Sequence, residues 1–304
     1  MSRRKLAAVA EATYRLRAGT ATRRDTDLLD QVALQPLPGG YNNPLYRLRL
    51  DGRDLCLKLP VVDNRHRAQR EWQTLTLLAR RGRPLAPQPV WRAEHHDRPA
   101  ILMTLLAGTS LGGTSLRPSQ LDALGEALTD LYRITPADIT EPLPDVVMPA
   151  PTMLTRLRRT WASPPTPASP SLDRDLQALW QRWSTGPDPH LLRTPTPQAL
   201  GRGDPSLANI LWDGTRLAML DFEYAGWTDP AYELADLIEH PQSRATPDHI
   251  WDTFIDQFNL DPTARTRHHA ARRMFSLFWL VRLSLHPDHQ LTTQAERAKH
   301  LLTQ

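Results

Sequence analysis

The 304-residue sequence predicts a two-lobed α+β fold on three observations. The first third alternates apolar and polar residues over short segments, which is typical of strands. The remainder repeats apolar residues at helical spacing over longer segments. A short hairpin near residues 208–220 carries polar side chains between these helical segments. We therefore expect a β-rich N-terminal lobe with a leading helix over residues 1–106, and a larger, mostly helical C-terminal lobe with the hairpin over residues 107–304.

The composition excludes several classes of protein and of site. Hydrophobic residues make up 40% of the chain, which suffices for a core of ordinary size. The single cysteine, Cys56, excludes an internal disulfide framework and a cysteine-based zinc site, and it favours a reducing cytoplasm. The most apolar window, residues 274–285, contains Arg282 and is too short for a membrane span. The apolar run near the start is interrupted by Glu11 and is too short for the core of a signal peptide. We expect a cytoplasmic protein that has no membrane partner.

The net charge of +4 does not by itself indicate a nucleic-acid partner. Basic residues are scattered along the chain and are not interleaved with aromatic residues on one face. Almost all of them are arginines, and Lys58 is the one lysine that lies away from the termini. A compact ammonium suits a site that needs a point charge instead of a planar fork. We expect no nucleic acid among the partners, and Lys58 becomes a candidate site residue.

The first lobe is expected to start with an amphipathic helix at residues 4–18, which Gly19 ends. A β-hairpin follows, because residues 45–50 and 55–59 alternate in polarity and the dipeptide Asp51-Gly52 between them favours a tight turn. Alternation places Lys58 at the end of the second strand, on the same face as Cys56.

A glycine turn, a lysine and a glutamate in the first lobe together indicate a phosphate-binding site. Gly39 and Gly40 lack side chains, so backbone amides near them are able to approach a phosphate. Lys58 follows one hairpin later, and Glu71 lies in the helix expected at residues 67–80. A lysine at an exposed sheet edge is the alternative interpretation. In kinases, however, a strand lysine binds the nucleotide phosphates and a glutamate from the following helix holds it.

Strands at residues 89–92 and 100–105 complete the first lobe. The second of them runs into a short linker between the lobes, where backbone groups, with Met103 and Leu105 nearby, suit an adenine base. The alternative interpretation is an ordinary buried strand followed by a turn. Helices are expected in the second lobe at residues 118–134, 153–161, 172–183, 230–240, 249–258, 265–286 and 292–302.

The stretch from Gly201 to Gly226 carries the most specific pattern in the chain. Asp204 and Asn209 lie five positions apart, and Asp221 directly follows an apolar strand. Kinase-type phosphoryl transfer needs such a set, because one carboxylate accepts a proton from the attacking hydroxyl while an amide oxygen and a second carboxylate hold magnesium. Taken alone, the same set also fits other metal sites, including hydrolytic ones.

The chain resembles the aminoglycoside phosphotransferase and choline kinase-like superfamily of small-molecule kinases. The resemblance covers residues 37 to about 240. It rests on the segments GGYNNPLY, ILMTLLAG, GRGDPSLANIL and LDFEYAGWTDPAYELADL, and on Lys58 with Glu71. The order and spacing of the third and fourth segments make the resemblance specific. It implies a bilobal protein kinase-like fold and the cofactors ATP and magnesium (Mg2+).

The resemblance also implies roles for individual residues. Asp204 corresponds to the catalytic base, Asn209 and Asp221 to the magnesium ligands, and Lys58 to the lysine that binds phosphate. Glu223 corresponds to an acidic position of the choline kinase-like members. Residues that correspond to the nucleotide-covering loop and the hinge are Gly39, Gly40 and Asn43, and Met103 through Leu106.

One residue departs from the family pattern, since Arg202 stands where the family usually has a histidine. The family histidine braces the catalytic loop, and we expect the arginine to pair with a nearby carboxylate and serve the same purpose. The function that we expect is transfer of the ATP γ-phosphate to a hydroxyl of a small molecule. A protein of the same fold that binds a ligand without turnover is the alternative from another class.

The acceptor is the least specified part of the prediction. It is a hydroxylated small molecule, either an aminoglycoside-type antibiotic or a metabolite such as choline or ethanolamine. Acidic residues that are candidates for a cationic acceptor are Asp229, Glu233, Asp236, Glu239, Asp252 and Asp256. Aromatic residues that are candidates for a cage around a quaternary ammonium are Tyr224, Trp227, Tyr232, Trp251 and Trp279. The wet face of a helix and an ordinary core explain these two sets equally simply, and we favour that interpretation.

Overall fold

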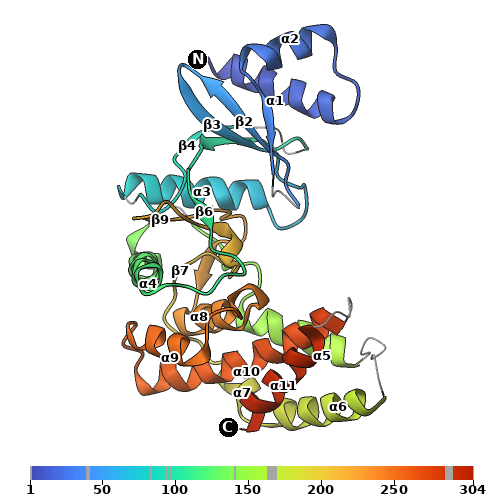
Figure 1. Cartoon of the computed structure of the whole chain (residues 1–304), viewed down its shortest axis with the longest axis vertical. Coiled ribbons are helices and arrows are strands. Elements are labelled where there is room, and N and C mark those ends of the chain that lie inside the picture. The colour runs from blue at the N-terminus through green and yellow to red at the C-terminus, as the bar shows by residue number, and fades with distance from the viewer. Residues whose placement is uncertain are drawn as a thin grey trace. The chain divides into compact units, whose positions relative to one another are not determined.

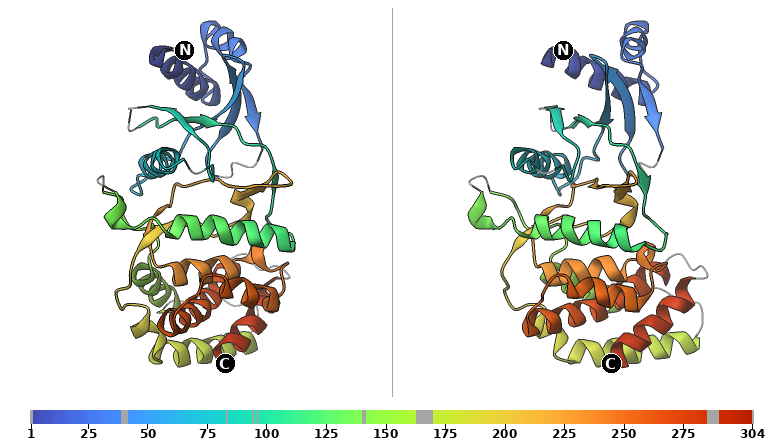
Figure 2. Two further views of the ribbon diagram at one scale, coloured as in Figure 1. Left: turned by 90° about the vertical axis from the view of Figure 1, so that its left-hand side faces the viewer. Right: turned by 60° about the vertical axis from the view of Figure 1, so that its left-hand side comes forward.

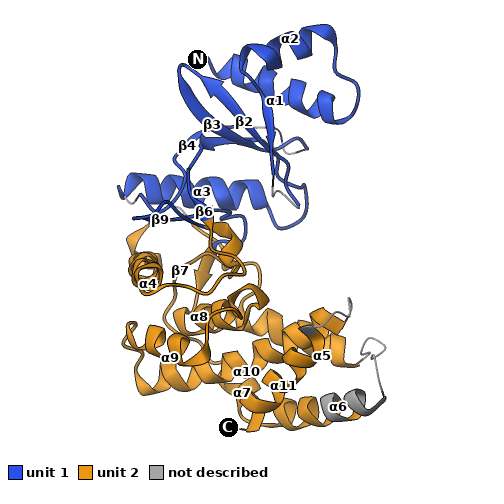
Figure 3. Ribbon diagram, viewed as in Figure 1, with its two compact units in different colours: residues 1–109, 211–225 blue, residues 110–210, 226–304 orange. Residues whose placement is uncertain are grey.

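The computed structural model describes residues 2–38, 42–82, 84–93, 95, 97–139, 142–162, 170–284 and 290–303 (Figure 1). Within these ranges, none of the helices combines the length and the apolar character that crossing a lipid bilayer demands. The chain forms two compact units (Figure 3). Unit 1 contains residues 1–109 and 211–225, and unit 2 contains residues 110–210 and 226–304. Most of the predicted hairpin therefore belongs to unit 1, and the functional division of the chain after residue 106 stays a prediction.

Unit 1 contains a small antiparallel sheet and three helices. Its helices are α1 (Arg3–Arg17), α2 (Arg23–Gln31) and α3 (Arg67–Arg80). Its five-stranded sheet has the order β1-β2-β3-β5-β4, with β1 (Gln35–Leu37), β2 (Leu45–Leu50), β3 (Arg53–Lys58), β4 (Pro89–Arg92) and β5 (Ile101–Thr104). A second, three-stranded sheet has the order β6-β8-β9, with β6 (Thr109–Ser110), β8 (Ile210–Trp212) and β9 (Leu217–Met219).

The predicted β2–β3 hairpin is present. Asp51 and Gly52 both have positive φ, 49° and 75°, which is the conformation that a two-residue turn between twisted strands requires. Leu55 and Leu57 of β3 belong to a hydrophobic cluster with residues of α1 and α2, while Lys58, on the alternate face, pairs with Glu71 of α3. Both faces of β3 are therefore covered, which explains why all of its last four residues are buried.

Unit 2 is mostly helical. Its helices are α4 (Pro118–Tyr132), α5 (Ala150–Ala162), α6 (Pro170–Thr185), α7 (Asp188–Leu191), α8 (Pro230–Glu239), α9 (Asp248–Asp256), α10 (Pro262–Ser284) and α11 (Gln290–Thr303). Short 3-10 turns lie at Pro136–Asp138, Leu207–Asn209 and Pro241–Ser243. Helix α10 packs against α5, α7, α8 and α11 (Figure 2). Its buried residues form a core cluster with residues of these neighbours, and this core fixes the position of α8.

A short two-stranded sheet precedes the loop that carries Asp204. Strand β7 (Ala199–Gly201) pairs antiparallel with β10 (Gly226–Thr228). Gly226 lies so close to the segment 144–146 that a Cβ there would lie 2.2 Å from the carbonyl oxygen of Pro144. Glycine is therefore required at this position for steric reasons.

The predicted helices and strands are largely present, and α3 has the predicted bounds. The predicted start of the first hairpin strand, at residue 208, was wrong. Ala208 and Asn209 belong to a 3-10 turn, and strand β8 begins only at Ile210. The sequence did not predict α2, α7, β1, β6, β7 or β10. All except α2 have two to four residues, a length over which neither a helical nor an alternating period is detectable.

Candidate functional site

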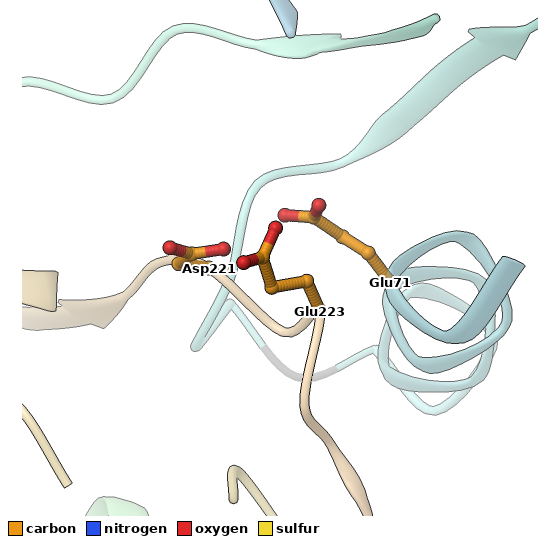
Figure 4. Close-up of side chains that lie close together, drawn as sticks. All are labelled: Glu71, Asp221 and Glu223. Atoms are coloured by element: carbon orange, nitrogen blue, oxygen red, sulfur yellow. The ribbon is translucent and has the colours of Figure 1, made fainter. Parts of the chain in front are cut away.

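Lys58 lies at the centre of a buried cluster of carboxylates in unit 1. Its Nζ lies 2.7 Å from Glu71 Oε2, 2.5 Å from Asp221 Oδ1 and 3.3 Å from Glu223 Oε2. The three acidic side chains point toward one another (Figure 4), and one carboxylate oxygen from each lies within 4.8 Å of the other two. The predicted pairing of Lys58 with Glu71 is therefore present, and Lys58 supplies the cation at the centre of these carboxylates.

Charge and burial act against each other in this cluster. Burial would lower the pKa of Lys58, but the negative charges of Glu71, Asp221 and Glu223 together raise it above its ordinary value, so Lys58 stays charged. Burial raises the pKa of Glu71 to about 7, because the nearby charge of Lys58 offsets only part of the desolvation. The cluster contains three carboxylates around one ammonium, and Asp221 is the most exposed of them, with 28% of its side chain accessible.

Glu223 is held more firmly than the sequence indicated. Its carboxylate is almost fully buried and accepts hydrogen bonds from Asn43 Nδ2 at 2.6 Å and from Arg67 Nη1 at 2.8 Å. The side-chain oxygen of Asn43 accepts a third bond, from the backbone N–H of Val61, at 2.9 Å. Asn43 is thus buried and bonded on both sides of its amide, and a role for it in covering a nucleotide stays a prediction.

Asp221 occupies an unusual backbone conformation two residues after the end of β9. Its φ is 62°, in the left-handed region that few residues other than glycine adopt, although aspartate tolerates it better than most. Such conformations concentrate at functional sites because the surrounding structure has to hold them in place. Here the ion pair with Lys58 fixes the side chain, which is the one partly exposed carboxylate of the cluster.

The loop after β7 in unit 2 carries the other half of the predicted set. Asp204 accepts a hydrogen bond from the backbone N–H of Ser206 at Oδ1 and from Asn209 Nδ2 at Oδ2, each at 2.9 Å. Gln242 braces the loop from outside, since its Oε1 accepts from Ser206 Oγ at 2.8 Å and from the backbone N–H of Ala208 at 2.9 Å. The structure thus brings Asp204 and Asn209 together and fixes the orientation of the Asp204 carboxylate.

Arg202 does not pair as the sequence led us to expect. Its side chain is buried, and within the described ranges its Nε and Nη2 atoms have no hydrogen-bond partner and its guanidinium makes no salt bridge. Instead the backbone N–H of Arg202 donates to Glu233 Oε1 at 2.8 Å. Burial raises the pKa of Glu233, and this hydrogen bond and the Arg202 charge oppose the rise. Glu233 of α8 therefore anchors the chain just before Asp204, a role that the sequence pattern did not reveal.

The remaining predicted nucleotide residues are placed as follows. Met103 lies in β5 and is buried, with its Cα opposite that of Cys56 in β3. Leu105 follows the end of β5, and its side chain is partly buried. Gly39 and Gly40 lie outside the described residues. The role of these four residues in binding a nucleotide stays a prediction.

Most acidic candidates for an acceptor pocket have arginine partners. Asp229 pairs with Arg267, Glu239 with Arg244, Arg272 and Arg297, Asp252 with Arg272, and Asp256 with Arg265. Aromatic candidates are mainly core residues, since Trp227, Tyr232 and Trp251 are buried. Trp279 is partly buried and packs edge-on against His240. The interpretation of the aromatic set as core thus fits Trp227, Tyr232 and Trp251, whereas the interpretation of the acidic set as the wet face of a helix is wrong for Glu233 and Glu239, because both are buried.

Asp236 differs from the other acidic residues of α8. It is partly buried, and none of the described side chains forms a hydrogen bond or an ion pair with its carboxylate. Burial raises its pKa well above the ordinary value, and the charges of Asp204 and Glu233 raise it further. A carboxylate in this environment is stabilised by any cation that binds beside it.

Several solved structures with a similar fold are named as small-molecule phosphotransferases or kinases. A thermostable mutant of the aminoglycoside phosphotransferase APH(4)-Ia, in a ternary complex with AMP-PNP and hygromycin B, aligns with a TM-score of 0.62 and 12% identity, covering 93% of this chain and 98% of that one. A choline/ethanolamine kinase family protein from Mesorhizobium loti aligns with a TM-score of 0.59 and 20% identity, covering 89% and 88%. Spectinomycin phosphotransferase APH(9)-Ia, in complex with ADP and spectinomycin, aligns with a TM-score of 0.57 and 13% identity, covering 89% and 91%.

These likenesses confirm the predicted protein kinase-like α+β fold. No curated protein sequence matches the chain significantly. The family profile described as the phosphotransferase enzyme family matches residues 33–274, which is most of the chain and includes Lys58, Asp204 and Asp221. The predicted superfamily and the predicted class of enzyme are thereby confirmed, and the chain belongs to the phosphotransferase enzyme family of small-molecule kinases.

Proposed function

We propose that this protein transfers the γ-phosphate of ATP to a hydroxyl group of a small molecule. The observation that carries the proposal is the buried, charged Lys58, held by Glu71 and Asp221 inside a chain of the phosphotransferase family. An ammonium that is kept charged in a desolvated cluster interacts strongly with phosphate oxygens. The AMP-PNP and ADP bound in the similar structures agree with ATP as the donor.

Asp204 has the chemistry required of the residue that activates the acceptor. In the proposed reaction the acceptor oxygen forms a bond to the γ-phosphorus, the bond from that phosphorus to the bridging oxygen of ADP breaks, and Asp204 takes the hydroxyl proton. Its two oxygens are oriented by Ser206 and Asn209, so the carboxylate needs little reorganisation before it accepts the proton. Lys58 neutralises phosphate charge during the transfer.

The residues proposed for magnesium have a suitable donor set. Magnesium prefers hard oxygen ligands, and Asp221 offers a partly exposed carboxylate. Asn209 donates its amide nitrogen to Asp204, so its amide oxygen is the atom suited to a metal ion. We propose that Asn209 and Asp221 hold the ion. When bound, magnesium supplies positive charge against the phosphate oxygens.

The acceptor that we favour carries a protonated amine and few further positive charges. Asp236 is the acidic residue of α8 for which the described residues provide no partner, and its charge acts on Asp204. A protonated amine beside Asp236 would compensate this charge. The arginine partners of the other acidic candidates disfavour a strongly polycationic ligand. An ethanolamine-like metabolite, or an antibiotic with a single amine, therefore fits better than a polyamine aminoglycoside.

The test is an ADP-release assay with ATP, magnesium and a panel of acceptors that includes choline, ethanolamine, sugars and aminoglycosides. We expect acceptor-dependent ADP release that Asp204→Asn abolishes while nucleotide binding persists. Asp213→Asn, in the exposed turn between β8 and β9, is the matched control and should retain activity. Nucleotide binding without turnover across the whole panel would refute the enzyme and favour a non-catalytic binding protein. Asp236→Asn should raise the KM for an amine acceptor and leave the KM for ATP unchanged.

A further inference from the structure

Three arginines at the start of α3 hold the segment that carries Glu223. Arg65 Nη1 donates to the hydroxyl of Tyr224 at 3.0 Å, and Arg70 Nη1 donates to the carbonyl oxygen of Ala225 at 3.1 Å. Between them Arg67, the first residue of α3, donates to Glu223 Oε1 at 2.8 Å. Helix α3 and the loop that leads into it are therefore joined to residues 223, 224 and 225 by side-chain hydrogen bonds.

Arg67 is the most buried and most constrained of these arginines. Its exposed fraction is 8%, and its guanidinium bridges two carboxylates, with Nε 2.8 Å from Asp63 Oδ2 and Nη1 2.8 Å from Glu223 Oε1. The ring of Tyr224 lies below it, with 5.1 Å between the ring centroid and Cζ. The planar fork of an arginine makes these contacts simultaneously, whereas a lysine at this position offers one charged atom.

The charges around Lys58 show what this bridge achieves. Lys58 faces three carboxylates, from Glu71, Asp221 and Glu223, and it contacts Glu223 at the longest of the three distances, 3.3 Å. Arg67 lies closer to Glu223, at 2.8 Å, and forms a charge-assisted hydrogen bond with it. Without this second cation, Lys58 would be the one cation among the described residues to balance all three carboxylates, and less of its positive potential would remain for a phosphate.

Asn43, 180 positions before Glu223 in the chain, also supports the Glu223 carboxylate. Its amide donates to Glu223 Oε2 at 2.6 Å and accepts from the N–H of Val61 at 2.9 Å. Each oxygen of the Glu223 carboxylate thus has its own donor, Arg67 at Oε1 and Asn43 at Oε2, before Lys58 is counted. The orientation of Glu223 is consequently independent of its weaker contact with Lys58.

We propose that Arg67, together with Asn43, is a positioning residue for the reaction, because it neutralises Glu223 and so leaves the charge of Lys58 directed at Asp221 and at the nucleotide phosphates. This inference rests on the proposed function, since it assigns the Lys58 cluster to a bound nucleotide. It assigns Arg67 a role that acts through Glu223 and not through a contact with the phosphates. The device is electrostatic, because a mere brace at the start of α3 would not require a positive charge at this position.

The experiment compares four proteins: the wild type, Arg67→Ala, Arg67→Lys and Arg80→Ala. The last is the matched control, because Arg80 is an exposed residue at the other end of α3. We expect Arg67→Ala to raise the Kd for MgATP and MgADP by roughly tenfold, the lower range for losing a charge-assisted hydrogen bond. Arg67→Lys should lose less, and added guanidinium at millimolar concentration should partly restore the affinity of Arg67→Ala alone.

Circular dichroism and the melting temperature show whether each variant is folded, so a loss of nucleotide affinity is distinguished from a loss of the fold. A folded Arg67→Ala protein that binds nucleotide within twofold of Arg80→Ala would overturn the proposal. The proposal would also be overturned if Arg67→Ala and Arg67→Lys lost the same affinity and added guanidinium restored none of it. That result would show that Arg67 acts through packing and not through its charge. Nucleotide binding is measured by calorimetry and needs no acceptor. If the wild type binds ATP but shows no turnover, the proposed function is refuted, and the nucleotide affinities of the Arg67 variants still test the role of Arg67. A wild type that binds no nucleotide refutes both.

Discussion

The C-terminal helices contain a buried carboxylate whose removal has a calculable effect on stability. Glu239, at the end of α8, is fully buried. It accepts hydrogen bonds from Arg272 Nε at 2.9 Å and from Arg297 Nε and Nη2 at 2.6 and 2.7 Å, and Arg244 Nη2 lies at 3.2 Å. This one side chain therefore holds together α8, α10, α11 and the turn after α8. We predict that Glu239→Gln destabilises unit 2 without changing its fold.

The magnitude follows from the partners that the substitution leaves behind. Removing one partner of a buried ion pair costs about 3–5 kcal/mol, because the other charge stays buried without compensation. Asp248 and Asp252 still contact Arg272 and Arg297, so we expect the lower end, about 3 kcal/mol. At about 2–4 °C per kcal/mol for a domain of roughly this size, the melting temperature should fall by about 6–12 °C.

The predicted loss depends on pH in a defined direction. Burial alone would raise the pKa of Glu239, but the hydrogen bond from Arg297 and the charges of Arg244 and Arg272 lower it below the ordinary 4.5. A lowered pKa means that the stabilisation is fully present above the unfolded-state pKa and is lost as the pH falls toward the folded-state value. The difference between wild type and Glu239→Gln should therefore be full at pH 7 and shrink below about pH 4.5.

The assay is thermal unfolding followed by tryptophan fluorescence at pH 7 and at pH 4. Glu126→Gln is the matched control, because Glu126 is an exposed residue of α4 and the same substitution there should leave the melting temperature nearly unchanged. A decrease of less than about 2 °C at pH 7 would refute the ion-pair argument. So would a difference that grows as the solution is acidified, because that sign would require a raised pKa for Glu239.

Three further substitutions test the geometry of the site. Gly226→Ala places a Cβ 2.2 Å from the carbonyl oxygen of Pro144, a backbone atom that cannot rotate away, so soluble expression and melting temperature should both fall sharply; a wild-type melting curve would contradict the packing of β10. Glu233→Gln weakens the hydrogen bond to the backbone N–H of Arg202, so kcat should fall about tenfold while the KM for ATP stays unchanged. A change in the KM for ATP alone would argue against a role of Glu233 near Asp204. Lys58→Met should lower kcat/KM for ATP by about a hundredfold, and unaltered ATP affinity and rate would show that the nucleotide site lies elsewhere.

The sequence predicted those parts of the fold in which local pattern dominates. The β2–β3 hairpin follows from alternation and from one turn dipeptide, and α3 from a period of apolar residues over fourteen positions. Strands β7 and β10 were missed because three residues carry no period, and each is a strand only by pairing with the other. Such pairings become visible only when segments distant in sequence meet.

The candidate site shows the same limit for charged residues. Lys58 and Glu71 were paired from the sequence because a known pattern joins a strand lysine to the following helix. The bond between Asn43 and Glu223 joins residues 180 positions apart, and no local signal announces it. Likewise the sequence pattern of the acidic residues of α8 is compatible with a ligand site. In the structure, however, Glu239 pairs with Arg297, which lies 58 positions later in the chain.

The position of the single cysteine has a practical consequence for labelling the protein. Cys56 lies in β3, within the five-stranded sheet, and burial raises the pKa of its thiol to about 12. At neutral pH almost none of it is thiolate, the form that reacts with maleimides and iodoacetamides. A cysteine introduced at exposed Val62, just after β3, would therefore take up a fluorophore selectively, and the native thiol need not be removed first. The dye would then report on nucleotide binding in a protein whose Lys58 and carboxylate partners are unchanged.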